Sequence, residues 1–147
     1  MPLPWESLPL RQCWRFVKED SLDLFIGGAF QGKLDYAKEK FGFTQNDVYE
    51  CNENTAGIDF MKPCINHLEE FTLACVRQGV DPVQYFQQHF EDARDLCLIC
   101  MDISSGVVPL GKEMRLWRNE NGKLCQYLSR QSKSVTRIFC GLEQVLK

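Results

Sequence analysis

The segment Phe25–Leu34, with the sequence FIGGAFQGKL, is the most informative part of the chain. From Gly27 to Lys33 it matches the G-x-x-x-x-G-K pattern, but Leu34 stands where a magnesium-binding Ser or Thr is expected. Glycines at this spacing let successive backbone N–H groups point toward phosphate oxygens, and the following helix adds its positive end. We therefore expect a phosphate-binding loop. A glycine-rich turn without a ligand is the alternative.

The loop and its lysine define a set of positions expected to bind a nucleotide. They are Gly27, Gly28, Ala29, Gln31, Gly32, Lys33 and Leu34. Lys33 would reach the terminal phosphates as a point charge. Leu34 cannot coordinate magnesium, and the carboxylate of Asp35 is turned about 100° away around the helix. Such a loop is expected to bind phosphate but to catalyse poorly.

The residues around the loop provide the context that it requires. Residues 22–27 form an apolar run typical of a buried strand, and Lys33–Phe41 predicts a helix ending at Gly42. Further elements are predicted at Asp47–Cys51 (strand), Pro63–Val76 (helix), from Pro82 (helix), Asp95–Met101 (strand), Glu113–Gln131 (helix) and from Val135 (strand). Residues 119–122, NENG, would equally suit a hairpin turn. Alternating strands and helices predict a three-layer α/β domain with a mostly parallel sheet over residues 21–147, after an N-terminal extension of residues 1–20.

The composition is typical of a soluble globular protein. Of the 147 residues, 44% are apolar and 25% are charged, which suits one domain. The net charge of −3 gives no support to nonspecific nucleic-acid binding. No apolar run approaches the roughly 18 residues of a membrane span. The start of the sequence lacks the pattern of a signal peptide, so we expect a cytoplasmic protein without membrane or nucleic-acid partners.

The chain has 8 cysteines, for which three explanations compete. A disulfide framework is typical of small secreted domains, and a zinc site needs close Cys or His pairs on loops. The close pair Cys97 and Cys100 lies in an apolar run, and in a strand these two sulfurs point to opposite faces. Reduced cysteines that pack in the core are therefore the favoured interpretation.

A second segment, Met101–Pro109, follows an apolar strand with the sequence MDISSGVVP. Asp102 stands at the end of this strand, where open α/β sheets bind ligands. Arg115 and Arg118 follow in RLWRNENG and could line an anion site together with Lys112 and Lys123. A solvated helix face is the alternative for these four basic residues.

Taken together, GGAFQGKL, MDISSGVVP, RLWRNENG and FCG resemble the adenosylcobinamide kinase/adenosylcobinamide-phosphate guanylyltransferase family of cobalamin biosynthesis. That family has a loop like G-G-A/S-x-S-G-K-S. A later strand ends in N/D-E-V/I-G-x-G-I/V-V-P, and a helix with R-x-F/Y-R-D/E-x-x-G follows. The resemblance runs in order from about Leu22 to Lys147. It implies a P-loop fold and phosphoryl transfer from ATP or GTP to a corrinoid hydroxyl.

The resemblance also implies roles for individual residues. Lys33 and Asp102 would be catalytic, with Asp102 in place of a glutamate that binds Mg²⁺ or orders a water. Arg115 and Arg118 would bind substrate, and Gly106 and Pro109 would shape the loop. Because related enzymes assemble as trimers, a homo-oligomer is expected.

The sequence departs from the family pattern at several positions. Leu34, Met101 and Ser104 replace a hydroxyl, an Asn/Asp and a glycine, and no segment corresponds to the one carrying the guanylylated histidine. His67 and His89 are interpreted as partly buried helix residues, and the acidic pair Glu69–Glu70 as solvation. Guanylyl transfer is therefore expected to be lost. A P-loop pseudoenzyme that binds nucleotide or corrinoid, or a relic with a role in assembly, is the alternative.

Overall fold

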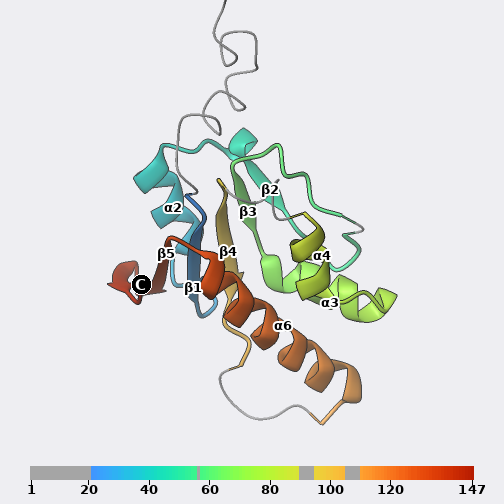
Figure 1. The fold of residues 1–147 in the computed structure, drawn as a ribbon. Coiled ribbons are helices and arrows are strands. Elements are labelled where there is room, and N and C mark those ends of the chain that lie inside the picture. Colours follow the sequence, from blue (N-terminus) through green and yellow to red (C-terminus); the bar gives the residue numbers. More distant parts are fainter. Residues whose placement is uncertain (1–20, 56, 90–94, 105–109) are drawn as a thin grey trace, which may run out of the picture.

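A six-stranded sheet lies at the centre of the structure (Figure 1). The computed structural model describes residues 21–55, 57–89, 95–104 and 110–147. The strands are β1 (Asp23–Gly27), β2 (Val48–Glu50), β3 (Cys64–Asn66), β4 (Cys97–Met101), β5 (Ser134–Phe139) and β6 (Leu142–Val145). They lie in the order β2-β3-β4-β1-β5-β6. The first five in this order are parallel, and β6 pairs antiparallel with β5 at one edge.

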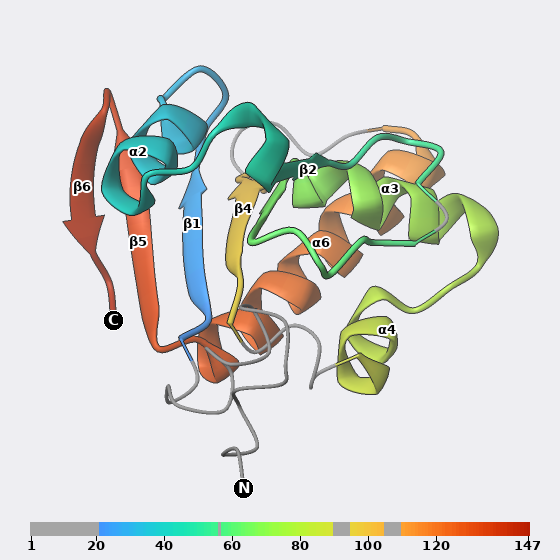
Figure 2. The ribbon, with the colours of Figure 1, turned by 90° about the horizontal axis from the view of Figure 1, so that it is seen from above.

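Helices cover both faces of the sheet (Figure 2). They are α2 (Lys33–Phe41), α3 (Leu68–Gln78), α4 (Pro82–Gln88) and α6 (Lys112–Gln131), with a short 3₁₀ turn at Gln45–Asp47. Ala37 of α2 packs on one face with Phe25 and Ile99, whereas Phe71 of α3 and Leu124 of α6 pack on the other. The predicted three-layer α/β arrangement with a mostly parallel sheet is therefore observed.

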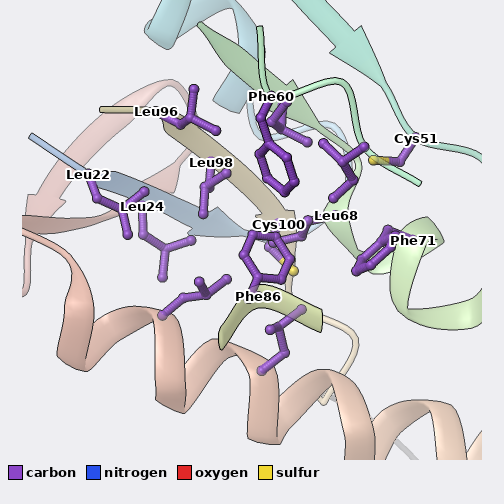
Figure 3. Packing of buried hydrophobic residues seen from close by; sticks show 14 of the residues in the cluster. Leu22, Leu24, Cys51, Phe60, Leu68, Phe71, Phe86, Leu96, Leu98 and Cys100 are labelled. Atoms are coloured by element: carbon purple, nitrogen blue, oxygen red, sulfur yellow. The ribbon is translucent and has the colours of Figure 1, made fainter. Parts of the chain in front are cut away.

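The larger core cluster lies between the sheet and helices α3, α4 and α6 (Figure 3). Phe71 of α3 and Phe86 of α4 are fully buried, and their ring centroids lie 5.8 Å apart. They share this cluster with Leu24 and Leu98 of the sheet and Leu124 of α6. Full burial of one such side chain contributes about 1.5–3 kcal/mol, so this packing fixes α6 against the central strands.

The connections after β1 and β4 leave the sheet toward opposite faces. β1 leads through residues 28–32 to α2, and β4 leads through residues 102–111 to α6 on the other face (Figure 2). β1 and β4 are neighbours and parallel, so both connections start at the same end of the sheet. In open α/β sheets a ligand crevice forms outside the carboxyl ends of two such strands. The fold therefore brings Gly27, at the end of β1, and Asp102, just after β4, to the same end of the sheet.

Most of the predicted elements are observed. The strands predicted at residues 22–27, 47–51, 95–101 and from 135, and the helices predicted at 33–41, from 82 and at 113–131, are present with small shifts of their ends. Residues 119–122 lie inside α6, so the hairpin alternative is wrong. The reason is tertiary: Asn121 is buried, and its Oδ1 accepts a hydrogen bond from Thr72 Oγ1 at 3.1 Å.

The predicted helix Pro63–Val76 is wrong over its first residues. Cys64–Asn66 form β3, and α3 begins only at Leu68, after His67 with a left-handed φ of 55°. Because β3 pairs with both β2 and β4, its backbone is fully used in the sheet, and this outweighs the helical spacing of its apolar residues. β6 was not predicted, since all of its residues are exposed and no apolar pattern marks it.

The described cysteines are free thiols, as expected, and most of them are buried. Cys97 and Cys100 lie on opposite faces of β4, in the two separate core clusters, which confirms the prediction for this pair. Burial raises the pKa of the Cys75 thiol to about 12, as expected for a core residue. The N-terminal extension, Gly106 and Pro109 lie outside the described residues. Among the helices described, none is both long and apolar enough to cross a membrane.

Candidate functional site

The glycine loop, residues 27–32, follows a path that only glycine allows at two positions. A Cβ on Gly27 would lie 2.4 Å from the backbone oxygen of Ile138 in β5, which is closer than any real contact. Gly32 has a φ of 87°, in the left-handed region that glycine tolerates at no steric cost. The first glycine thus lets β1 pack against β5, and the second turns the chain into α2.

The loop presents unpaired backbone donors. Within the described part of the chain, the N–H groups of Ala29, Phe30, Gln31 and Gly32 have no hydrogen-bond acceptor. The first N–H groups of α2, which begins at Lys33, also lack intrahelical partners, as in any helix. Donors of this kind at a helix N-terminus attract anions.

Lys33 lies across the loop. Its Nζ donates a hydrogen bond to the backbone oxygen of Gly28 at 2.6 Å. Burial lowers the pKa of the Lys33 ammonium, while the negative charge of Glu69 opposes this shift. The cation is therefore held near the loop's N–H groups rather than extended into solvent.

Gln31 anchors the loop to the turn between β5 and β6. Its Oε1 accepts a hydrogen bond from Cys140 N at 2.6 Å, and its backbone oxygen accepts one from Gly141 N at 2.9 Å. The Gln31 side chain is therefore already used in a bond to Cys140, and it would have to leave this bond to contact a nucleotide. Phe30, at the tip of the loop, is fully exposed.

Leu34 packs against the core cluster beneath α2, which contains Phe25 and Ala37. The residue therefore contributes apolar contact at the position where a hydroxyl would bind magnesium. The leucine that replaces the Ser or Thr of the motif thus helps to pack α2 against the sheet.

Asp102 joins the glycine loop to the segment after β4. Its backbone N–H donates to Gly27 O at 2.8 Å, so the two connections lie side by side at the carboxyl ends of β1 and β4. The Asp102 carboxylate is exposed, and its Oδ1 accepts hydrogen bonds from Ser104 N at 2.9 Å and Ser104 Oγ at 2.6 Å. Arg118 of α6 donates to the backbone oxygen of Ser104. These hydrogen bonds form a continuous network from the glycine loop through Asp102 and Ser104 to Arg118.

Two adjoining cavities lie between this segment and α6. One has a volume of about 330 Å³ and is lined by Ile26, Met101, Asp102, Ser104, Asn121, Gly122, Cys125 and Gln126. The other, of about 360 Å³, is lined by Arg115, Arg118, Asn119 and Lys123 and shares Ser104, Gly122 and Gln126 with the first. The predicted basic residues therefore surround a hollow that continues to Asp102. Lys112, at the start of α6, does not line it.

Glu69 is a site residue that the sequence analysis missed. It was interpreted as solvated, but its side chain is only 1% exposed. Its Oε2 accepts a hydrogen bond from Met101 N at 2.9 Å, and its Oε1 lies 2.9 Å from His67 Nδ1. The interpretation fails because the left-handed turn at His67 directs the first turn of α3 toward the end of β4. A carboxylate is thus buried against the backbone of Met101, the residue that precedes Asp102.

The two histidines differ in their surroundings. The His67 side chain is 54% exposed and lies 2.9 Å from Glu69 and 3.8 Å from Glu50, so the prediction of a partly buried helix residue is wrong for it. His89 is partly buried at the end of α4 and stacks on Tyr85 at a ring distance of 4.3 Å, as predicted.

The residues present provide few ligands for a metal ion. In residues 21–55, 57–89, 95–104 and 110–147, no three His, Cys, Asp or Glu side chains gather in a way that could hold a metal. Magnesium in nucleotide sites is commonly bound by one or two carboxylates together with the phosphates. Asp102 could provide one such ligand, and Leu34 provides none. A magnesium ion here would depend mainly on the nucleotide.

No protein-family model matches the chain, and neither does any curated protein. The resemblance based on the motifs therefore stays a prediction.

Proposed function

We propose that the chain binds the phosphates of a nucleoside triphosphate, ATP or GTP, in the glycine loop. The observation that carries this proposal is the arrangement of residues 28–33: four N–H groups of the loop have no acceptor among the described residues, and the Lys33 ammonium bonds to Gly28 O of the same loop. This arrangement lies at the carboxyl ends of two parallel strands whose connections diverge. Phosphate suits both the N–H donors and the lysine, because it accepts several hydrogen bonds and carries the opposite charge to lysine.

As its activity we propose phosphoryl transfer to a hydroxyl of a corrinoid, as in the adenosylcobinamide kinase family that the motifs resemble. Lys33 would neutralise the terminal phosphates, and Asp102 would bind Mg²⁺ or order the attacking hydroxyl. Arg115 and Arg118 line the hollow that continues from Asp102, which makes them the candidates for substrate binding. Mg²⁺, where bound, supplies charge neutralisation to the phosphates. Guanylyl transfer is not part of the proposal, because the chain lacks the segment that carries the nucleophilic histidine.

A catalytically inactive P-loop protein, which binds nucleotide or corrinoid in a regulatory or assembly role, is the second candidate. The packing of the partly buried Leu34 against the core favours it, since the loop then binds phosphate without the usual magnesium ligand. The two candidates share the phosphate site and differ only in turnover.

A phosphorylation assay separates the candidates. Cobinamide is incubated with ATP or GTP labelled in the terminal phosphate, with wild type and the Asp102→Asn variant. Labelled corrinoid that depends on Asp102 would support the kinase. Retention of the labelled nucleotide by wild type on a filter, without transfer, would support the inactive protein. The absence of retained nucleotide would reject the kinase and the phosphate site that the two candidates share.

A further inference from the structure

Two cysteines from different elements meet beside the candidate site. Cys100 of β4 and Cys125 of α6 are 25 residues apart in sequence, and their Sγ atoms lie 3.6 Å apart. A disulfide needs a sulfur–sulfur distance of about 2.05 Å, so the sulfurs must approach by roughly 1.5 Å. Side-chain rotation and small shifts of a helix provide movements of this size.

The two thiols differ in access. Cys125 is partly exposed and lines the cavity of about 330 Å³ together with Met101 and Asp102. Cys100 is 0% exposed and belongs to the larger core cluster. A small reagent that enters the cavity therefore reaches the Cys125 sulfur first, with Cys100 directly behind it.

We propose that Cys100 and Cys125 form an oxidisable dithiol, which hydrogen peroxide converts to a disulfide. The Cys125 sulfur attacks the peroxide, forming an S–O bond while the O–O bond breaks, and the first water leaves. The Cys100 sulfur then attacks the Cys125 sulfenic acid. The S–S bond forms, the S–O bond breaks, and the hydroxyl leaves with the Cys100 proton as a second water. Two thiols lose two electrons, and one hydrogen peroxide becomes two waters.

The disulfide would join the two elements on either side of the segment that carries Asp102. β4 ends at Met101, next to Cys100, and α6 carries Cys125 on the wall of the same cavity. Oxidation would thus fix α6 against the end of β4. The dithiol does not depend on the proposed nucleotide function, because its chemistry needs only the two sulfurs and a path for peroxide.

A second thiol pair in the same sheet provides an internal control. Cys64 and Cys97 stand opposite each other as register partners on the parallel strands β3 and β4. Both are buried in the cluster beneath α2, with Cys64 0% and Cys97 3% exposed. Neither of these two thiols lines the cavity that Cys125 lines, so we expect the pair to resist peroxide.

The test is peptide mapping of the whole reduced protein after graded hydrogen peroxide and alkylation of the remaining thiols. A peptide linking Cys100 to Cys125 is expected before any oxidation of Cys64 or Cys97. Cys100→Ser should leave a Cys125 sulfenic acid that dimedone traps, and Cys125→Ser should leave Cys100 reduced. The exposed Cys140 reports that the oxidant is active. Complete oxidation of Cys140 without the Cys100–Cys125 link, or equally fast oxidation of the buried pair, would overturn the proposal. The mapping on wild type decides this even where a variant does not fold.

Discussion

The loop after β1 and the segment after β4 lie side by side, joined by the hydrogen bond from Asp102 N to Gly27 O, yet they are built differently. The glycine loop takes much of its shape from its own residues, since Gly32 turns the chain into α2 and Lys33 bonds back to Gly28, while Gly27 lets it fit against Ile138 of β5. The segment after β4 is held by distant residues, with Glu69 of α3 at Met101 N and Arg118 of α6 at Ser104 O. Local geometry provides the donors, and tertiary contacts place the carboxylate.

The largest effect is expected from a change in the glycine loop. Gly27→Ala would place a Cβ 2.4 Å from the Ile138 oxygen and force β1 away from β5. We expect the free energy of unfolding to fall by about 2–3 kcal/mol, measured by urea denaturation. Gly28→Ala is the matched control, because its Cβ would meet only Gln31 Cγ at 3.7 Å. Equal stability of the two variants would contradict the steric account of the loop.

The second prediction concerns the contacts that hold the end of β4. Glu69→Ala removes the buried acceptor of Met101 N–H, and we expect a loss of about 2 kcal/mol of stability. Glu70→Ala, at the next and less buried position, should cost less than about 0.5 kcal/mol. If both variants unfold at the same urea concentration as wild type, Glu69 does not hold the end of β4.

The third prediction concerns the charge of Lys33. Burial lowers its pKa below the ordinary value of 10.5, and only the protonated amine attracts phosphate. Nucleotide affinity should therefore fall as the pH rises through this lowered pKa, and it should be constant at lower pH once the nucleotide is fully ionised. Lys33→Arg should remove this fall, because a guanidinium stays protonated. Titrations from neutral to alkaline pH that show no difference between wild type and Lys33→Arg would contradict the prediction.

The smallest effect is expected from restoring the missing hydroxyl. Leu34→Ser would supply a magnesium ligand at the start of α2, at a cost of about 1 kcal/mol in lost packing. Magnesium should then strengthen nucleotide binding by up to about tenfold more than in wild type. Binding measured with magnesium and with a chelator checks this. An unchanged magnesium dependence would mean that position 34 does not face the phosphates.

The same contrast explains what the sequence could predict. The loop, β1, α2 and β4 follow from consecutive residues, so glycine spacing and apolar runs identify them. The role of Glu69 depends on a backbone group 32 positions away, and Asn121 stays helical because of Thr72, 49 positions away. No local pattern contains such partners. β3 was missed for a related reason, since three residues acquire strand structure only through the neighbours on both sides.

The central claim is that the glycine loop binds nucleotide phosphates through Lys33. Calorimetric titration with ATP and GTP, with and without magnesium, tests it on wild type, Lys33→Ala and Lys38→Ala. Lys38 lies on the same helix and bonds to Gln45, away from the loop, so its variant is the matched control. We predict micromolar binding by wild type and Lys38→Ala, weakened about tenfold or more in Lys33→Ala. No binding of either nucleotide by wild type at millimolar concentration, or equal binding by Lys33→Ala, would contradict the account.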